Sequence, residues 1–419
     1  MPSQHIIPVQ FQAEGEQPQG IIVPLDLPEL KILKQEVQPD GSIAVHVRAL
    51  TDREACPGCR NICVKVHDTR MRVKRDIDLR NYQIRLVLYK RRFRCFACRR
   101  TFTEPDSTCG KYKRTTKRFR EDLAKRTMQQ PIAHVAQAVE VGPRFVQDCF
   151  ESFIQEKFAK KGIDLNETSK LATPRFLGID EFARRKGHHY DTILCDLDAR
   201  TVVEISEGRK LEDVQKLLER LSDPDKVEAV SMDMSASFRP AVQLCLPKAK
   251  IVVDHFHVIQ HVMKAYKKIV SRWAHKKEGK SLLQGKQYLF LAAKEDLTEE
   301  QAQDRSKIGA ALPLLEAAWQ LKEALRSWYA TSTAATAAQG LDTWIEQVQK
   351  SGFDHLRKAL SAFKNWRQEI LAFFHFLPTR ISNGFVEGKN NRTKALMRQG
   401  YGYRNRQHLR MRILVGHGA

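Results

Sequence analysis

The sequence predicts a multidomain protein in which a cysteine-bearing β-rich part and a pair of helices precede a mixed α/β core and a long helical block. Three observations lead to this prediction. Two CxxC motifs lie in the first quarter of the chain, with 36 positions from Cys59 of the first to Cys95 of the second. Runs that alternate between strand and helix periodicity begin near residue 170. Helical spacing then continues to about residue 378, and all five tryptophans fall in that stretch.

Length and charge narrow the class of partner. The 419 residues allow roughly two to four domains. The 71 Lys and Arg against 49 Asp and Glu give a net charge of +22, spread from Arg70 to Arg412. A positive field of this extent favours nucleic acid or an anionic membrane surface. The sequence has no apolar run long enough to span a membrane and no basic-then-apolar signal, so we expect a cytoplasmic protein that binds nucleic acid.

The first part, residues 1–50, is expected to be a β-rich segment. A Pro-Asp-Gly turn at positions 39–41 precedes the alternating Ile43, Val45 and Val47, which is typical of a hairpin. The segment shows no residue pattern that points to chemistry.

The second part, residues 51–110, holds the two CxxC motifs. Four thiolates on two tight turns are the ligand set that tetrahedral zinc takes in a closed structural site. In a reducing compartment such pairs indicate a metal rather than disulfides. We therefore expect a zinc ribbon with one structural Zn²⁺; free or buried cysteines are the alternative. The expected ligands are Cys56, Cys59, Cys95 and Cys98.

Basic residues are dense around the second CxxC motif. Their density exceeds what solubility requires, so we interpret the ribbon as a DNA-contacting element, and a solvated charged face is the alternative. These residues are Lys90, Arg91, Arg92, Arg94, Arg99 and Arg100.

The third part, residues 111–155, changes to helical periodicity. Apolar residues at helical spacing over 132–139 define one helix, a Gly-Pro break follows, and a second helix begins. This order is typical of a DNA-binding helix-turn-helix, although any helical hairpin with a glycine turn shares it. On this interpretation Arg144 and Gln147 lie on the exposed face of a recognition helix and contact DNA.

The next part, residues 170–260, has the order strand, hairpin, helix, strand, helix, strand and helix, which is that of a ribonuclease H-like core. Three of its apolar runs end in acids, namely Asp180, Asp233 and Asp254. In open α/β sheets reactive residues collect where strands end, so such acids can meet around one metal. A turn residue or a helix cap is the alternative, above all for Asp233.

Carboxylates that meet in this way suit phosphodiester chemistry. Two divalent ions about 4 Å apart can stabilise a transferring phosphoryl group and activate a water or a 3′-hydroxyl. Magnesium accepts carboxylate oxygens and substrate phosphates, so a few converging acids suffice. Asp180 and Asp233 are the candidates, because each follows an apolar strand and precedes a polar stretch.

The helical block spans residues 261–378. A capping box at Thr298 and Gln301 indicates the start of one of its helices. Large aromatic residues at helical spacing normally form core, and stacking of one tryptophan on an unpaired base is the alternative. The tryptophans are Trp273, Trp319, Trp328, Trp344 and Trp366.

The last part, residues 379–419, is strongly basic. Glu387 is the one acid between Arg380 and Leu396, and it either balances a neighbouring Lys or holds a metal where a phosphate arrives. Further on, arginines alternate with tyrosines, which suits tracking of a DNA backbone, although docking of an amphipathic helix explains half of the pattern. The arginines expected to contact DNA are Arg398, Arg404 and Arg406.

Four segments together resemble the signature blocks of a known family. LGIDEF, SMDMSASFRPA, VVDHFHV and RISNGFVEGKNNRTKALMRQGYGYRN are similar to those of the DDE transposases of bacterial insertion sequences, specifically the ISL-three group. The likeness runs over nearly the whole chain. It implies a ribonuclease H-like core that is split by the helical block as an insertion, with 170–260 as its first part and 379–419 as its last helix and basic tail.

The resemblance also implies a mechanism. Asp180, Asp233 and Glu387 would form a catalytic triad that binds two Mg²⁺ or Mn²⁺ ions for strand cleavage at the element ends and strand transfer into a target. Asp254 and His257 match a further block and are expected to lie behind the ligands or to orient substrate; an ordinary core or surface histidine is the alternative for His257.

Glu387 would then lie on a helix beginning after Ser382-Asn383. Residues three, four and seven positions further fall on the same helix face, so amide and cationic groups could hold phosphates beside the ions. These residues are Asn390, Asn391 and Lys394.

The implied partners are double-stranded DNA, at the element ends and at the target, and a second copy of the chain. Because two element ends must be joined, we expect a homodimer or a higher oligomer, in a nucleoid-associated bacterial protein without a membrane partner. Two other functions remain open. A zinc-containing DNA-binding regulator leaves the acids and the NGFVEGKNN block unexplained, and a ribonuclease H-like nuclease would cut without joining.

Overall fold

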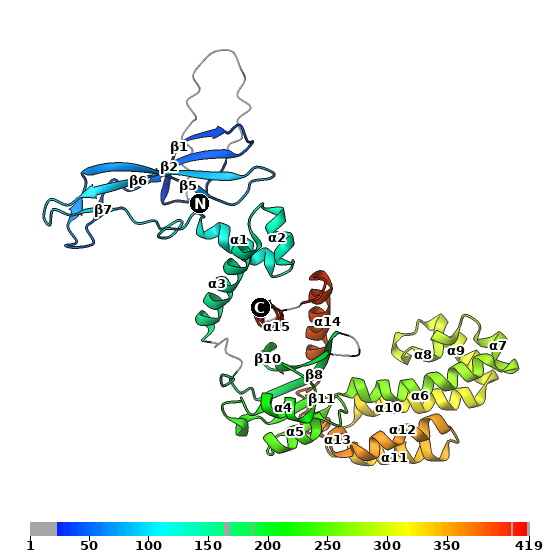
Figure 1. Cartoon of the computed structure of the whole chain (residues 1–419). Coiled ribbons are helices and arrows are strands. Elements are labelled where there is room, and N and C mark those ends of the chain that lie inside the picture. Colours follow the sequence, from blue (N-terminus) through cyan, green and yellow to red (C-terminus); the bar gives the residue numbers. More distant parts are fainter. Residues whose placement is uncertain (1–22, 163–167, 186, 188, 404, 417–419) are drawn as a thin grey trace. The chain divides into compact units, whose positions relative to one another are not determined.

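The computed structural model describes residues 23–162, 168–185, 187, 189–403 and 405–416. The chain divides into two compact units, residues 1–163 and 164–419 (Figure 1). Arg404, which we expect to contact DNA, lies outside the described residues. In the part of the chain that is described, no helix is both long and apolar enough to cross a membrane.

The first unit contains a five-stranded sheet. Its order is β1-β2-β6-β5, and β7 pairs with β6. β1 and β2 form the hairpin predicted at the Pro-Asp-Gly turn, where Gly41 has a φ of +80° that favours glycine. Alternating apolar residues of β2 and β6 pack into one small core. The strands are β1 (Leu30–Val37), β2 (Ile43–Ala49), β5 (Val66–Arg75), β6 (Ile84–Arg94) and β7 (Thr101–Thr103), with a separate small pair β3 (Glu54–Ala55) and β4 (Ile62–Cys63).

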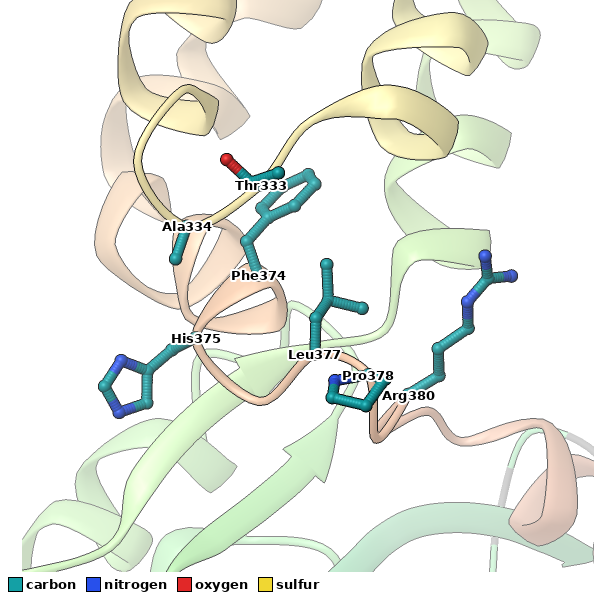
Figure 2. A pocket seen from close by; sticks show the side chains of 7 residues that line it. All are labelled: Thr333, Ala334, Phe374, His375, Leu377, Pro378 and Arg380. Atoms are coloured by element: carbon teal, nitrogen blue, oxygen red, sulfur yellow. The ribbon is translucent and has the colours of Figure 1, made fainter.

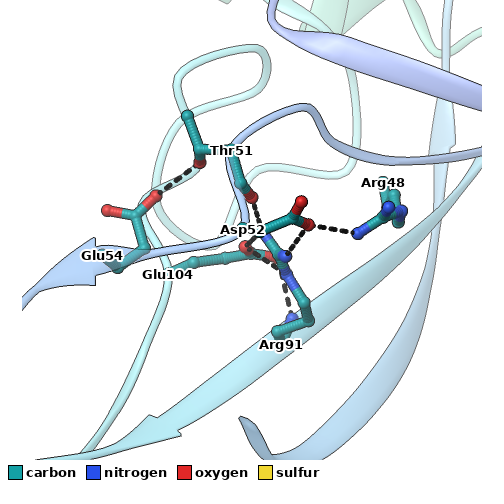
Figure 3. A network of polar contacts seen from close by, with 6 residues as sticks. All are labelled: Arg48, Thr51, Asp52, Glu54, Arg91 and Glu104. Carbon is teal, nitrogen blue, oxygen red and sulfur yellow. Dashed lines mark hydrogen bonds and ion pairs between the residues drawn. The ribbon is translucent and has the colours of Figure 1, made fainter. Parts of the chain in front are cut away.

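The first unit contains a buried ion pair between Arg91 and Glu104 (Figure 3). The Arg91 guanidinium donates to Glu104 at 2.8 and 3.0 Å, and Glu104 also accepts from the backbone N–H of Arg91. The carbonyl of Thr51 and the carboxylate of Asp52 complete the network. Arg91 is only 6% exposed, so this member of the basic group around the second CxxC motif is used inside the fold.

Three helices follow in the same unit. α1 (Lys117–Thr127) is capped by the Thr116 hydroxyl, which accepts from the backbone N–H of Phe119. α2 (Ile132–Ala138) and α3 (Pro143–Lys161) are joined by a short turn, and Pro143 occupies the first position of α3, where its missing N–H costs nothing. Apolar residues of the three helices form a common core.

The second unit is built on a five-stranded sheet of order β10-β9-β8-β11-β12. β8, β11 and β12 are parallel, and β9 and β10 run antiparallel to their neighbours. Figure 1 shows α4 and α5 on one side of this sheet and α14 and α15 on the other. The strands are β8 (Phe176–Arg185), β9 (His189–Asp196), β10 (Thr201–Glu207), β11 (Ala229–Met232) and β12 (Lys250–Val253). The helices are α4 (Leu211–Leu218), α5 (Phe238–Cys245), α14 (Gly384–Gln399) and α15 (Arg406–Gly416).

A helical block lies between β12 and α14 in the chain, and its core is continuous with that of the sheet. Four of the five tryptophans are buried in it, and Trp273 is half-buried, so the tryptophans act mainly as core. The Thr298–Gln301 capping box begins α9 as predicted. The helices are α6 (His255–His275), α7 (Lys277–Leu283), α8 (Gln287–Leu291), α9 (Glu299–Ala311), α10 (Pro313–Thr331), α11 (Ala337–Lys350), α12 (Asp354–Asn365) and α13 (Arg367–His375).

Candidate active site and metal centres

The four cysteines of the CxxC motifs meet in the first unit. Their sulfur atoms all lie within 4.8 Å of one another, with 3.5 Å between Cys56 and Cys98 and 3.4 Å between Cys59 and Cys95. A tetrahedral zinc site with bonds of about 2.3 Å separates its sulfurs by about 3.8 Å, so this donor set fits such an ion. Backbone N–H groups, first that of Cys98, lower the pKa of Cys95 to about 6, which favours the thiolate that a metal needs.

Three acids of the second unit come to one level of the sheet. Asp233 and Asp254 directly follow β11 and β12. The parallel register pairs Ser231 with Gly178 on one side and with Val252 on the other. Two residues further along each strand, the same register sets Asp233 between Asp180 and Asp254. Asp180 itself lies within β8 rather than at its end, because β8 continues to Arg185 as a hairpin with β9.

A histidine connects two of these acids. His257, in the first turn of α6, has its Nδ1 2.8 Å from Asp233 Oδ1 and 3.3 Å from Asp254 Oδ2. These contacts raise the pKa of His257 to about 10, against the opposing effect of burial. Asp254 is fully buried and also caps α6 by accepting from the backbone N–H of Phe256. Burial opposes its charge, but hydrogen bonds from His255 and His257 hold the pKa of Asp254 below its usual value.

Asp180 is the acid that contacts the last part of the chain. Its Oδ2 accepts a hydrogen bond of 2.6 Å from the side-chain amide of Asn390 on α14. Burial, followed by the nearby charge of Asp233, raises the pKa of Asp180 to about 6, although the Asn390 hydrogen bond acts in the other direction. Asp180 and Asp233 therefore lie close enough for their charges to repel, which is the arrangement that a shared cation relieves.

α14 packs directly against β8 because β8 has a glycine at the contact. Leu177 and Ile179 belong to the core shared with α4, whereas Gly178 and Asp180 lie on the α14 side of the strand. A Cβ on Gly178 would lie 2.5 Å from Val386 Cγ2 of α14 and 2.8 Å from a methyl of Leu197.

A second amide fixes the start of α14. Asn383 donates its side-chain amide to the carbonyl of Ile179 at 3.0 Å, one turn before Val386. Sequence reasoning placed the start of this helix after Asn383, but it gave neither Asn383 nor Gly178 a role at the site. A glycine inside a strand is the one signal that could have pointed to this close approach.

Glu387 lies on α14 one turn before Asn390, and its side chain is exposed. In the residues that the structure describes, the cysteine cluster is the one group of three or more His, Cys, Asp or Glu whose ligand atoms all lie within 4.8 Å of one another. The structure therefore brings Asp180 and Asp233 together at one level. It puts Glu387 on the helix that contacts Asp180, and the ligand atoms of Asp180, Asp233 and Glu387 do not all lie within 4.8 Å of one another.

The donors around these acids suit a hard divalent ion. They are oxygens of carboxylates and amides, the ligand type that magnesium and manganese take. The side-chain oxygens of Asn383 and Asn390 are buried on this side of β8 without a hydrogen-bond partner, so oxygen acceptors remain there beside the carboxylates.

The residues expected to contact DNA differ in their surroundings. Arg144 is 75% exposed on α3 and forms an ion pair with Asp148, and Gln147 donates to Glu151 at 2.7 Å. Arg406 belongs instead to the fold of the second unit, where it donates to the carbonyl of Ile205. Asn391, Lys394 and Arg398 are exposed on α14.

The second unit also has a cavity of about 520 Å³ (Figure 2). It is formed where the loop after α10 meets the end of α13, with His375 and Arg380 on opposite sides of it. His375 is held by Lys250, whose Nζ lies 2.7 Å from its Nε2. The cavity has no carboxylate in its lining and so supplies no acidic metal ligand. Its lining residues are Thr333, Ala334, Phe374, His375, Leu377, Pro378 and Arg380.

Comparison with known proteins gives a consistent result. Residues 177–413 match the ISL-three family of DDE proteins, and the description of this family is transposase. The transposase for insertion sequence element IS1001 of Bordetella parapertussis is 25% identical over 389 residues, which cover 90% of this chain and 91% of that protein. The transposase for insertion sequence element IS1557 of Mycobacterium tuberculosis is 26% identical over 278 residues, which cover 59% of this chain and 62% of that protein.

Proposed function

The chain belongs to the ISL-three group of DDE transposases, and from this premise we propose that Asp180, Asp233 and Glu387 hold the divalent ions of its active site. On this proposal the chain binds the terminal repeats of an insertion sequence and catalyses metal-dependent strand cleavage and strand transfer. The observation that carries this proposal is the parallel register of β8 and β11, which brings Asp180 and Asp233 to one level. The contact of Asn390 with Asp180 supports Glu387 as the third ligand, because both residues lie on α14.

Two Mg²⁺ or Mn²⁺ ions would supply charge stabilisation for the transferring phosphoryl group and activate the attacking oxygen. The chain's own residues do the positioning. Asn390 holds one oxygen of Asp180, and His257 holds Asp233 while Asp254 holds His257. Asp254 and His257 are therefore positioning residues. The exposed groups of α14 lie beside Glu387 and can bind phosphates; they are Asn391, Lys394 and Arg398.

The mixed sheet supports a ribonuclease H-like core for residues 170–260. Its order, β10-β9-β8-β11-β12, has an antiparallel meander next to parallel strands. Asp180 lies within one of the parallel strands, and Asp233 directly follows another. On this proposal α14 is the last helix of the core, residues 379–419 are its end and basic tail, and residues 261–378 are a helical insertion.

The first unit is proposed to recognise DNA. One structural Zn²⁺ on the four cysteines would hold the ribbon at residues 51–110, because the sulfurs are already within 4.8 Å of one another. α2 and α3, joined by a short turn, would form the helix-turn-helix within residues 111–155. Arg144 and Gln147 near the start of α3 would then contact the element ends, and joining two ends requires at least a dimer.

A supercoiled plasmid that carries two matching element ends tests the proposal. Glu387→Gln should abolish both magnesium-dependent cleavage and joining while DNA binding is retained. Loss of a direct ligand should exceed the roughly 10- to 100-fold effect of losing an outer partner. Glu300→Gln, an exposed change of the same kind on α9, serves as the matched control and should cleave normally.

The same assay separates the alternative functions. Cleavage by Glu387→Gln at the wild-type rate would rule out the triad. No cleavage by the wild-type chain would favour a DNA-binding regulator, and cleavage without joining would favour a nuclease.

A further inference from the structure

The outer face of α6 carries a line of basic side chains. α6, His255–His275, contains no Asp or Glu in its 21 residues. Its apolar positions are buried in the core of the second unit, so the opposite face is turned outward. Lys264, Lys268 and His275 are exposed on that face.

The line starts at the candidate acids. His257, the first residue on it, has its Nδ1 2.8 Å from Asp233. On the side of the helix that carries His257, basic side chains follow after 7, 11 and 18 residues, at Lys264, Lys268 and His275. At 3.6 residues per turn these steps are about 1.9, 3.1 and 5.0 turns, so the side chains project from the same side of the helix as His257.

The charge of this face is not balanced by the fold. In the part of the chain that the structure describes, no carboxylate lies within ion-pair distance of Lys264, Lys268 or Arg272. By contrast, Lys286, further along the same block, pairs with Asp304 at 2.7 Å. Beyond α6 the basic run continues with one acid, Glu278, among Lys276, Lys277 and Lys280. An uncompensated row of cations of this length attracts an extended anion.

We propose that Lys264, Lys268 and His275, the α6 stripe, hold the phosphate backbone of the DNA duplex next to the bond that is cut. The inference rests on the proposed function, because a scissile phosphate that reaches Asp180 and Asp233 also brings its flanking duplex to the start of α6. Lys264 and Lys268 lie about 10 and 16 Å along the helix from His257, at 1.5 Å per residue. That distance corresponds to about three to five base pairs at 3.4 Å per pair.

The salt dependence of DNA binding tests the stripe directly. The probe is a duplex that spans one cleavage site of the element, and the buffer contains no Mg²⁺ or Mn²⁺, so that nothing is cut. Adding K264Q/K268Q should reduce the slope of log Kd against log salt by about 1.8, because each lost phosphate contact removes about 0.9. An unchanged slope would overturn the proposal.

A matched pair on another helix of the same unit provides the control. Lys358 and Lys364 are exposed on α12, and K358Q/K364Q changes the net charge equally. This variant should leave the slope unchanged, and an equal reduction in both variants would show a general charge effect and overturn the assignment to α6. Circular dichroism melting verifies that both double variants fold.

The position along the DNA gives a second readout. Lys264→Cys should form a disulfide with a thiol tether placed about three base pairs from the cleaved bond, and Lys358→Cys should not. Cross-linking of Lys264→Cys only to tethers ten or more base pairs away would overturn the proposal. These measurements read binding alone, so they remain informative even if the cleavage assay removes Glu387 from the triad.

Discussion

At the scale of single residues, the candidate site depends on the absence of a side chain at Gly178. With no Cβ there, Val386 of α14 can approach β8 closely, and Asn390, one turn further, reaches Asp180. A methyl group at 2.5 Å from Val386 Cγ2 cannot be accommodated without a shift, because Val386 is fully buried and a β-branched side chain has little freedom. Gly178 therefore sets the distance between Asp180 and the helix that carries Glu387.

We predict that Gly178→Ala moves α14 outward and lowers the cleavage rate by about 10- to 100-fold, because displacement of a catalytic group by about 1 Å can cost that much. Overpacking of this kind should also cost about 1–3 kcal/mol of stability. Initial rates on the two-ended plasmid and urea unfolding measure the two effects.

Gly388→Ala on the same helix is the control for stability. No atom lies within 4 Å of a Cβ at Gly388, so this variant should be as stable as the wild type or up to about 1 kcal/mol more stable. A Gly178→Ala chain that cleaves at the wild-type rate would contradict the role assigned to the glycine.

Sequence reasoning reached the individual acids but not the contact that each of them makes. The acid after each apolar run is visible locally, because a run of buried residues ends where the chain turns polar. The Asn390–Asp180 hydrogen bond joins residues 210 positions apart, and helical spacing around Glu387 says nothing about which strand its helix covers. Asp180 was predicted at a strand end. The pattern of apolar and polar residues does not show that β8 continues beyond Asp180 and pairs with β9 as a hairpin.

At the scale of elements, α15 shows how a basic segment can be structural. Arg410 is 2% exposed and donates to Glu204 of β10 at 2.7 and 2.6 Å. Arg220 also donates to this carboxylate, at 2.8 Å. An arginine that reaches a buried acid and one that faces DNA look alike in sequence, because the partner of the first lies more than 200 residues away.

We predict that Glu204→Gln destabilises the second unit by about 3–5 kcal/mol, because it removes the buried carboxylate charge that Arg410 and Arg220 contact. Urea unfolding of the whole chain measures the change. Arg175→Gln breaks the exposed pair with Glu228 and should cost no more than about 1 kcal/mol. Equal effects of the two substitutions on the free energy of unfolding would contradict this prediction, because they would show that burial of the Glu204 network does not increase stability.

The cysteine ribbon makes a separate prediction at this scale. The purified chain should hold one zinc ion, and Cys95→Ser should hold none and lose element-end binding, because three thiolates no longer close the tetrahedral site. Native mass spectrometry counts the metal. Cys245→Ser, at a half-buried cysteine outside the cluster, should keep the ion. Retention of one zinc by Cys95→Ser would exclude the four-cysteine site.

At the scale of the whole molecule, the chain combines local motifs that sequence specifies well with long-range contacts that it does not. The CxxC spacing, the Pro-Asp-Gly hairpin and the capping box each depend on residues close together, and all three are present in the structure. The packing of α14 on β8 and of α15 on β10 brings residues from the two ends of the second unit together across the helical block. Only the folded chain reveals these contacts.

The most direct test of the central claim counts the manganese ions bound by the zinc-loaded chain on an element-end duplex, using electron paramagnetic resonance. The account predicts two ions per chain in the wild type and fewer in each of Asp180→Asn, Asp233→Asn and Glu387→Gln. Two ions in all three variants, at unchanged affinity, would contradict it.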